Sequence, residues 1–284
     1  MAVDWPTALA LGALQGVTEF LPVSSSGHLV LAQHYLGFTE QHRATAASLF
    51  LDGLLHLGTL LAVLAFFRRD LYRAVSAAGG DRHKLVIAGT RLLGLLVVAS
   101  LPAALTTLAL SDHIQSTFEN PVMVATSFLA LGVLLSLTDR LPERDTEFHN
   151  MRLWQALLIG LAQALSALIR GLSRSGMTIA GGLAVGLVRG WAVRFSFLMS
   201  IVANCGLGSL GIYKACRDPH VHEWLTGEFL LLALVATATS AVVGYLTMAP
   251  LVGLVRRARM SYFACYLWLV GAAVLAERAI HLGK

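Results

Sequence analysis

The sequence predicts an all-α integral membrane protein of about ten helices, with six full spans and two re-entrant helix hairpins in an inverted-topology repeat. Of its 284 residues, 56% are hydrophobic and only 13% are charged, whereas soluble domains carry roughly 25% charged residues. Six apolar stretches are long enough to cross a bilayer, and two further apolar regions are interrupted near their middles. No polar stretch could form a second domain, so we expect residues 1–284 to form a single membrane domain.

The six full spans have the length of roughly 20 apolar residues that a bilayer requires. They cover about 47–67, 86–109, 120–138, 192–213, 227–251 and 260–281. On a soluble protein a net charge of +5 would suggest nucleic acid, but here the basic residues gather in the short loops between alternate spans. Such a bias marks the cytoplasmic side. We therefore expect extracytoplasmic termini, membrane lipids as partners and no nucleic acid.

The two interrupted regions are residues 5–36 and 152–189. The first is broken by LPVSSSGH (Leu21 to His28) and the second by IRGLSRSGMT (Ile169 to Thr178). Most of the resulting pieces are too short to span a bilayer. Irregular backbone at membrane depth is tolerated only inside protein or beside a wet cavity. The pattern therefore predicts two re-entrant hairpins.

The two interrupted regions resemble each other at an offset of about 148 residues. A glycine precedes a glutamine by three positions in each, and a Ser-rich turn follows; the matched residues are Gly12 and Gln15, and Gly160 and Gln163. Each hairpin precedes three full spans, and an odd number of spans inverts the second unit. We therefore predict inverted repeats over about 5–138 and 152–281, whose hairpin tips meet near the midplane. The alternative is chance similarity among small residues.

Each tip carries groups suited to an anion. Ser24, Ser25 and Ser173 are candidate N-cap residues, so two helix N-termini would direct backbone N–H groups and positive dipole ends at one region. Arg174 adds a guanidinium that can grip two phosphate oxygens. A cation at membrane depth is costly and therefore indicates function. The alternative for Arg174 is a side chain that reaches out to the membrane interface.

Glu19 lies one turn before the first break, with Gln15 four residues earlier on the same helical face. A carboxylate would repel a bound phosphate unless a cation lay between them. We therefore expect Mg²⁺ or Ca²⁺ to bridge Glu19 and the phosphate, with Gln15 as a neutral oxygen ligand. The alternative is a direct ion pair between Glu19 and Arg174, and the two arrangements are compatible at different stages of turnover.

Histidines supply the candidate proton acceptor. His28 shares a helical face with Ser24 and Ser25, so it is a candidate general base or acid for phosphoryl transfer; the alternative is a structural histidine. Asp52 and His56 form a further pair one turn apart in the first full span. They are either part of the cavity wall around the site or simply a buried pair.

Four segments together resemble one known family. QGVTEFLPVSSSGH (Gln15 to His28) and GLSRSGMTIAGG (Gly171 to Gly182) look like the two main signatures of the bacitracin-resistance type of undecaprenyl-diphosphate phosphatase. DGLLHLGTLLAV (Asp52 to Val63) and RFSFLMS (Arg194 to Ser200) resemble two further blocks. The resemblance extends from about residue 5 to about residue 280, with the segments in the family's order.

The resemblance implies ten helices and hydrolysis of undecaprenyl diphosphate to undecaprenyl phosphate, which recycles the lipid carrier for cell-wall synthesis and confers bacitracin resistance. It implies a divalent cation held by Glu19, and a multi-pass protein of the bacterial plasma membrane with its site open to the extracytoplasmic side. The catalytic residues that it carries over are Glu19, Ser25, His28 and Arg174. Those that it implies around the substrate are Gln15, Ser24, Ser26, Ser173, Ser175 and Thr178.

Three positions depart from the family pattern. Gln15 occupies the first acidic position, Arg170 stands where proline is usual, and Val202 also replaces a common proline. Arg170 would either bind a phosphate or point towards the cytoplasmic interface. These changes leave room for a different rate or substrate.

Several alternatives stay open at this point. Either Ser25, activated by His28, attacks the phosphate, or water attacks directly with His28 as the base. The main functional rival is a transporter or flippase of a polyprenyl phosphate or small anion, because inverted repeats with broken helices are common in transporters. A homodimer is also left open.

Overall fold

The computed structural model describes residues 4–36, 46–75, 82–110, 120–142, 144–257 and 259–282. Within these ranges the chain is almost entirely helical and forms no strand; its one β-bridge joins Thr146 to Leu187. The predicted all-α class is therefore confirmed. Two short elements were not predicted, a 3-10 turn at Phe148–Asn150 and the one-turn helix α11 at Val221–Trp224.

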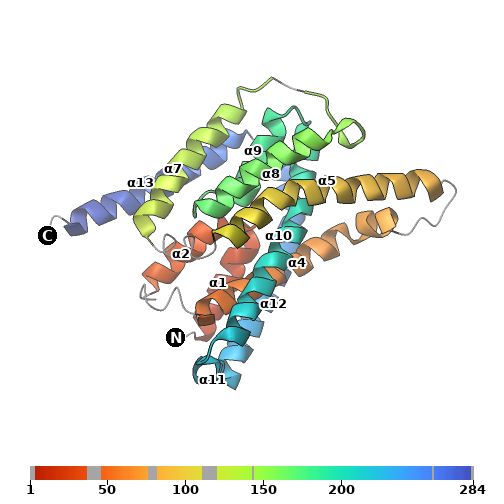
Figure 1. Ribbon diagram of the computed structural model, residues 1–284. Helices are drawn as coiled ribbons and strands as arrows, with labels where there is room; N and C mark the ends of the chain where they lie inside the picture. The colour runs from red at the N-terminus through yellow and green to blue at the C-terminus, as the bar shows by residue number, and fades with distance from the viewer. Residues whose placement is uncertain are drawn as a thin grey trace.

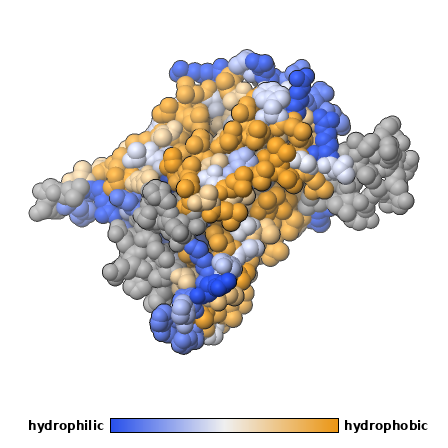
Figure 2. Space-filling model, in the orientation of Figure 1, coloured by the Kyte–Doolittle hydropathy of each residue, from blue (hydrophilic) through white to orange (hydrophobic). Residues whose placement is uncertain are grey.

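Six helices of the described chain are long and apolar enough to cross a membrane, as the sequence predicted. They are α4 (Ala46–Val75), α5 (Arg82–Ala109), α7 (Pro121–Thr138), α10 (Arg189–Arg217), α12 (Gly227–Arg257) and α13 (Met260–Leu282). Hydrophobic residues cover the middle of the face shown in Figure 2, while hydrophilic residues collect towards the top right and the bottom. The molecule is a multi-pass membrane protein.

Two pairs of shorter helices occupy the interrupted regions. They are α1 (Trp5–Thr18) with α2 (Ser25–Tyr35), and α8 (Leu153–Leu168) with α9 (Arg174–Ala184). Their lengths of 14, 11, 16 and 11 residues correspond to about 17–24 Å, less than the roughly 30 Å of a hydrocarbon core. The predicted breaks are therefore real, and re-entry into the membrane stays a prediction.

Serine side chains start the second helix of each pair. Ser24 Oγ accepts a hydrogen bond from the Gly27 N–H at 3.2 Å, and Ser173 Oγ accepts one from the Gly176 N–H at 3.0 Å. These bonds satisfy N–H groups that the first turn of a helix leaves free. Ser24 and Ser173 are thus N-caps as predicted, while Ser25 is the first residue of α2.

The helices pack in pairs that cross between the two halves of the chain. α4 packs on α10 and α7 lies beside α13, while α1 packs on α12 and α8 on α5 (Figure 1). An added Cβ at Gly12 of α1 would collide with the Ala236 carbonyl oxygen of α12, and one at Gly160 of α8 would collide with the Ala99 carbonyl oxygen of α5. The two aligned glycines therefore make equivalent close contacts, although the inverted repeat itself stays a prediction.

Candidate active site

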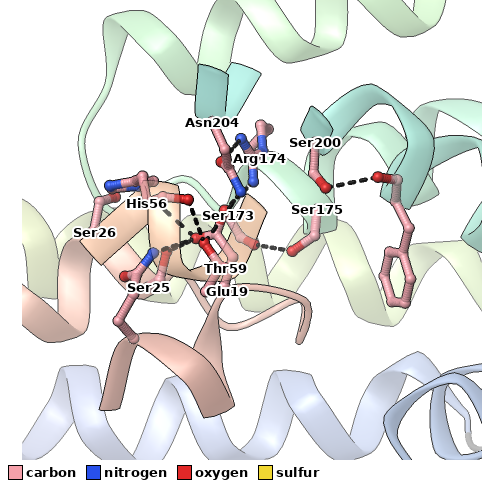
Figure 3. A network of polar contacts seen from close by, with 12 residues as sticks. Glu19, Ser25, Ser26, His56, Thr59, Ser173, Arg174, Ser175, Ser200 and Asn204 are labelled. Carbon is pink, nitrogen blue, oxygen red and sulfur yellow. Dashed lines mark hydrogen bonds and ion pairs between the residues drawn. The ribbon is translucent and has the colours of Figure 1, made fainter. Parts of the chain in front are cut away.

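Glu19 and Arg174 form an ion pair between the two hairpins. Glu19 ends α1 and its side chain is 2% exposed, whereas Arg174 begins α9 with 18% of its side chain exposed. Arg174 Nη2 donates to Glu19 Oε1 (Figure 3). The buried ring of Phe20 packs against Phe197 of α10, with centroids 5.4 Å apart, and so anchors the end of α1. The structure thus brings the two residues together in the direct pairing that the sequence left as an alternative.

A buried amide holds the other side of the Arg174 guanidinium. Arg174 Nη1 donates to Asn204 Oδ1 at 2.7 Å, and Asn204 Nδ2 donates to Thr59 Oγ1 at 3.2 Å. Asn204 and Thr59 are fully buried on α10 and α4. Asn204 is absent from the predicted site residues, although a single amide in the middle of an apolar span is a signal that could have identified it.

Ser25 and Gln15 converge on the second oxygen of Glu19. Ser25 Oγ donates to Glu19 Oε2 at 2.6 Å, and Gln15 Nε2 donates to the same oxygen at 3.0 Å. A distance of 2.6 Å is typical of a strong hydrogen bond from a hydroxyl to a carboxylate. The proton of Ser25 is therefore already directed at an acceptor.

The backbone at Ser24 is strained in a way that sets the position of Ser25. Ser24 has φ 72° and ψ 92°, and it is the only non-glycine residue of the described ranges with positive φ. Such a conformation costs about 1–3 kcal/mol and occurs mainly at functional sites. The bond from the Gly27 N–H to Ser24 Oγ and the bond from Ser25 Oγ to Glu19 stabilise this turn.

The side chains of His28 and His56 have different partners. His56 Nδ1 bonds to the Asp52 carbonyl at 2.7 Å, so Nδ1 carries a proton and Nε2 faces Glu19 Oε2 at 3.9 Å. His28 Nδ1 bonds to the Ser24 carbonyl at 2.8 Å, and His28 Nε2 lies 2.8 Å from the Tyr266 hydroxyl. The structure therefore directs His56 into the Glu19 cluster and turns His28 towards α13. The catalytic role of His28 stays a prediction.

The remaining predicted serines and the threonine form hydrogen bonds within and between the two hairpin tips. Ser24 and Ser26 Oγ atoms lie 3.4 Å apart, and those of Ser173 and Ser175 lie 2.9 Å apart. Ser175 Oγ also donates to the Leu21 carbonyl at 2.7 Å, which joins the second tip to the first. Thr178 Oγ1 lies 2.6 Å from Ser196 Oγ and donates to the Arg174 carbonyl at 2.8 Å. Contact of these side chains with substrate stays a prediction.

The donor set beside Glu19 fits a hard divalent cation. Gln15 Oε1 is buried and has no hydrogen-bond partner among the described residues, and Mg²⁺ and Ca²⁺ prefer carboxylate and amide oxygens. No group of three or more His, Cys, Asp or Glu residues in the described ranges could hold a metal by itself. A cation between Glu19 and Gln15 would therefore need further oxygens from phosphate or water.

Comparisons with known proteins agree with the resemblance seen in the sequence. The family model described as bacitracin resistance protein BacA matches residues 8–273. A protein of Geobacter sulfurreducens named undecaprenyl-diphosphatase is 41% identical over 276 residues, which is 96% of this chain and 98% of that protein. Proteins of the same name from Alcanivorax borkumensis and Rubrobacter xylanophilus are each 39% identical, over 96% and 95% of this chain and 98% and 96% of their own lengths.

Proposed function

The chain belongs to the bacitracin resistance protein BacA family, and from this membership we propose that it hydrolyses undecaprenyl diphosphate to undecaprenyl phosphate and inorganic phosphate. The observation that carries the proposal is the cluster of Glu19, Arg174 and Ser25, which joins a carboxylate, a guanidinium and a hydroxyl at two hairpin tips. The reaction recycles the lipid carrier for cell-wall synthesis. It also lies behind the resistance to bacitracin for which the family is named.

Arg174 binds the terminal phosphate. Its two terminal nitrogens lie on one edge of a planar group, so together they can grip two phosphate oxygens. These nitrogens donate to Asn204 and Glu19. Phosphoryl transfer relies mainly on positioning and on stabilisation of charge spread over the phosphoryl oxygens. A preset guanidinium at the start of α9 supplies both.

Ser25 is the nucleophile in this proposal. Its Oγ attacks the terminal phosphorus as its proton passes to Glu19 Oε2, the acceptor at 2.6 Å. The bond from phosphorus to the bridging oxygen breaks, and undecaprenyl phosphate leaves with the electron pair. Water then hydrolyses the phosphoserine, releases phosphate and restores the Ser25 hydroxyl. His56, with Nε2 at 3.9 Å from the same Glu19 oxygen, exchanges the proton with Glu19.

Glu19 and Gln15 would hold a divalent cation, Mg²⁺ or Ca²⁺, which when bound supplies Lewis-acid stabilisation of a phosphoryl oxygen. The orphaned Gln15 Oε1 supports this assignment. We place the protein in the bacterial plasma membrane with the site open to the extracytoplasmic side, on the strength of the basic loops. The prenyl chain would stay in lipid or between helices while the diphosphate enters.

Phosphate release by purified protein tests the proposal. The wild type is given undecaprenyl diphosphate with Mg²⁺, with Ca²⁺ and with EDTA, beside Arg174→Ala and an Arg140→Ala control at an exposed position just after α7. We expect release with metal, loss with EDTA, and a loss of about 100-fold or more in Arg174→Ala only.

The same protein in sealed vesicles separates hydrolysis from transport. Movement of a labelled prenyl phosphate across the bilayer, without any phosphate release when metal is present, would contradict the proposal and support a transporter.

A further inference from the structure

Arg170 lies outside the Glu19 cluster and is paired with Asp52. Arg170 Nη2 lies 3.4 Å from Asp52 Oδ2, and Gln33 Nε2 donates to Asp52 Oδ1 at 3.2 Å. Asp52 therefore joins α2 and the turn before α9 to α4. The side chains of Arg170 and Asp52 are 22% and 15% exposed, so this contact is open to a ligand in a way that the Glu19 carboxylate is not.

The Arg170–Asp52 pair lies next to the catalytic cluster along α4. Asp52 and His56 are four residues apart, a spacing of about 6 Å along a helix, and the Asp52 carbonyl accepts the bond from His56 Nδ1. His56 Nε2 in turn faces Glu19. In the orientation that the basic loops indicate, α4 runs from the extracytoplasmic side to the cytoplasmic side. The pair therefore lies on the extracytoplasmic side of the cluster, from which the proposed function has the lipid enter.

A diphosphate lipid brings two phosphates to such a site. If the terminal phosphate binds Arg174, the second phosphate, which carries the prenyl chain, must lie on the entry side. At 3.4 Å the contact from Arg170 to Asp52 is longer than the 2.7–2.9 Å typical of charge-assisted hydrogen bonds. Since a guanidinium has five N–H donors, Arg170 can engage a phosphate while Asp52 still restrains it.

We propose that Arg170 binds the lipid-linked phosphate of the substrate. Asp52 holds Arg170 in position and, as a competing negative charge, lowers the affinity of Arg170 for anions. The inference rests on the proposed function and names the residues of the same site that select a diphosphate. In this arrangement Arg174 binds the terminal phosphate and Arg170 binds the next one. The preference for diphosphates over monophosphates then depends on both arginines.

The two partners of the pair should change binding in opposite directions. Arg170→Gln removes the cation, so KM for the prenyl diphosphate should rise about 10-fold or more, as expected for the loss of a charge-assisted hydrogen bond. Asp52→Asn removes the competing charge and retains an oxygen for Gln33, so KM should fall severalfold. Inorganic pyrophosphate should lose its advantage over phosphate as a competitive inhibitor in Arg170→Gln.

The experiment measures KM, kcat and both inhibition constants for wild type, Arg170→Gln, Asp52→Asn and the control Arg140→Gln, which removes an equal charge at an exposed position. Melting temperatures in detergent are recorded for each. Opposite shifts of KM in the two variants support the proposal. A rise of KM in both variants, with lowered melting temperatures, would show that the pair only stabilises the fold. That result would overturn the proposal.

An unchanged KM in Arg170→Gln would also overturn the inference while leaving the hydrolysis intact. The absence of phosphate release from the wild type would instead overturn the proposed function. In that case direct binding of inorganic pyrophosphate and phosphate, measured by titration calorimetry, decides the inference. A loss of the preference for pyrophosphate in Arg170→Gln supports it, and equal preference in both proteins overturns it.

Discussion

Asn204 accepts a hydrogen bond from Arg174 Nη1 at 2.7 Å while Arg174 Nη2 donates to Glu19 (Figure 3). The guanidinium is thus fixed between the end of α1 and α10, and these two contacts set its plane. Asn204 is itself held by Thr59 of α4. The direction of Arg174 is therefore determined by the packing of α4 against α10.

Asn204→Ala should impair positioning of Arg174. Loss of a hydrogen bond to a charged group costs about 1.5–3 kcal/mol, so kcat/KM should fall about 10- to 100-fold, with kcat affected as well as KM. Thr59→Val, which removes only the partner of Asn204, should have a smaller effect in the same direction. Steady-state kinetics of both variants check this, and an Asn204→Ala enzyme with wild-type kcat would contradict the positioning role.

Ser25→Ala should reduce phosphate release to background, because the proposed route needs the Ser25 Oγ as nucleophile. Ser136→Ala, which removes a hydroxyl bonded to the Val133 carbonyl of its own helix, is the control and should retain most activity. Rapid quenching of the wild type followed by mass spectrometry should show one added phosphate on the peptide that contains Ser25. Full activity of Ser25→Ala would establish direct attack by water instead.

His56→Ala should lower kcat about 100-fold or more, in the range measured for loss of a proton-transfer group. His28 makes its contacts with Ser24 and Tyr266, so Tyr266→Phe should have a small effect on kcat and remove one hydrogen bond, worth about 0.5–1.5 kcal/mol of stability. Comparing kcat of His56→Ala with that of His28→Ala tests the assignment. A larger loss in His28→Ala than in His56→Ala would return the role to His28.

Gly12→Ala and Gly160→Ala should destabilise the protein to similar extents. Each new methyl group would strike a carbonyl oxygen of the neighbouring helix, and overpacking of this kind costs about 1–3 kcal/mol. Gly94→Ala on α5 is the control, since its Cβ would meet nothing within 4 Å, and it should raise stability by about 0.5–1 kcal/mol. Thermal unfolding in one detergent compares the three, and unequal effects at Gly12 and Gly160 would count against equivalent packing.

Asp139→Asn should weaken the junction of α7, α10 and α13. Burial opposes ionisation of Asp139, but bonds from the Ser261 and Met260 N–H groups and from Arg189 outweigh it and hold the pKa of Asp139 below its ordinary value. A carboxyl with a lowered pKa stabilises the fold above its unfolded pKa of about 3.9 and loses this as pH falls through the folded value.

Wild type should therefore lose stability below about pH 5, and Asp139→Asn should be less stable at neutral pH with a smaller loss on acidification. Melting temperatures between pH 7 and about pH 2 measure both. An equal decline in the two proteins would exclude Asp139 as the source.

Much of the architecture was predictable because it depends on local sequence. Apolar length determined the six spans, and the helix starts at Ser24 and Ser173 followed from a serine before a helical segment. The contact of Glu19 with Arg174 was foreseen, as the alternative to a bridging cation, because the two hairpin tips were expected to meet. α11 was missed because a single turn of four residues leaves no periodic signal.

Side-chain direction was not predictable, because it depends on which helices are neighbours. His28 shares a face with Ser24 and Ser25 on α2, as expected, yet α13 provides Tyr266 and turns the ring away. Asn204 became part of the site only through the packing of α10 on α4. Arg170 could not be assigned from sequence, since its partner Asp52 is 118 residues away.

Phosphate release from undecaprenyl diphosphate by Glu19→Gln, Arg174→Ala and the double variant tests most directly whether the two hairpins build a single catalytic centre. Residues that act as one unit are strongly non-additive. We predict that each single variant loses about 100-fold or more in kcat/KM and that the double variant is little worse than either one. Losses that multiply in the double variant, or single variants that retain wild-type activity, would contradict the shared centre.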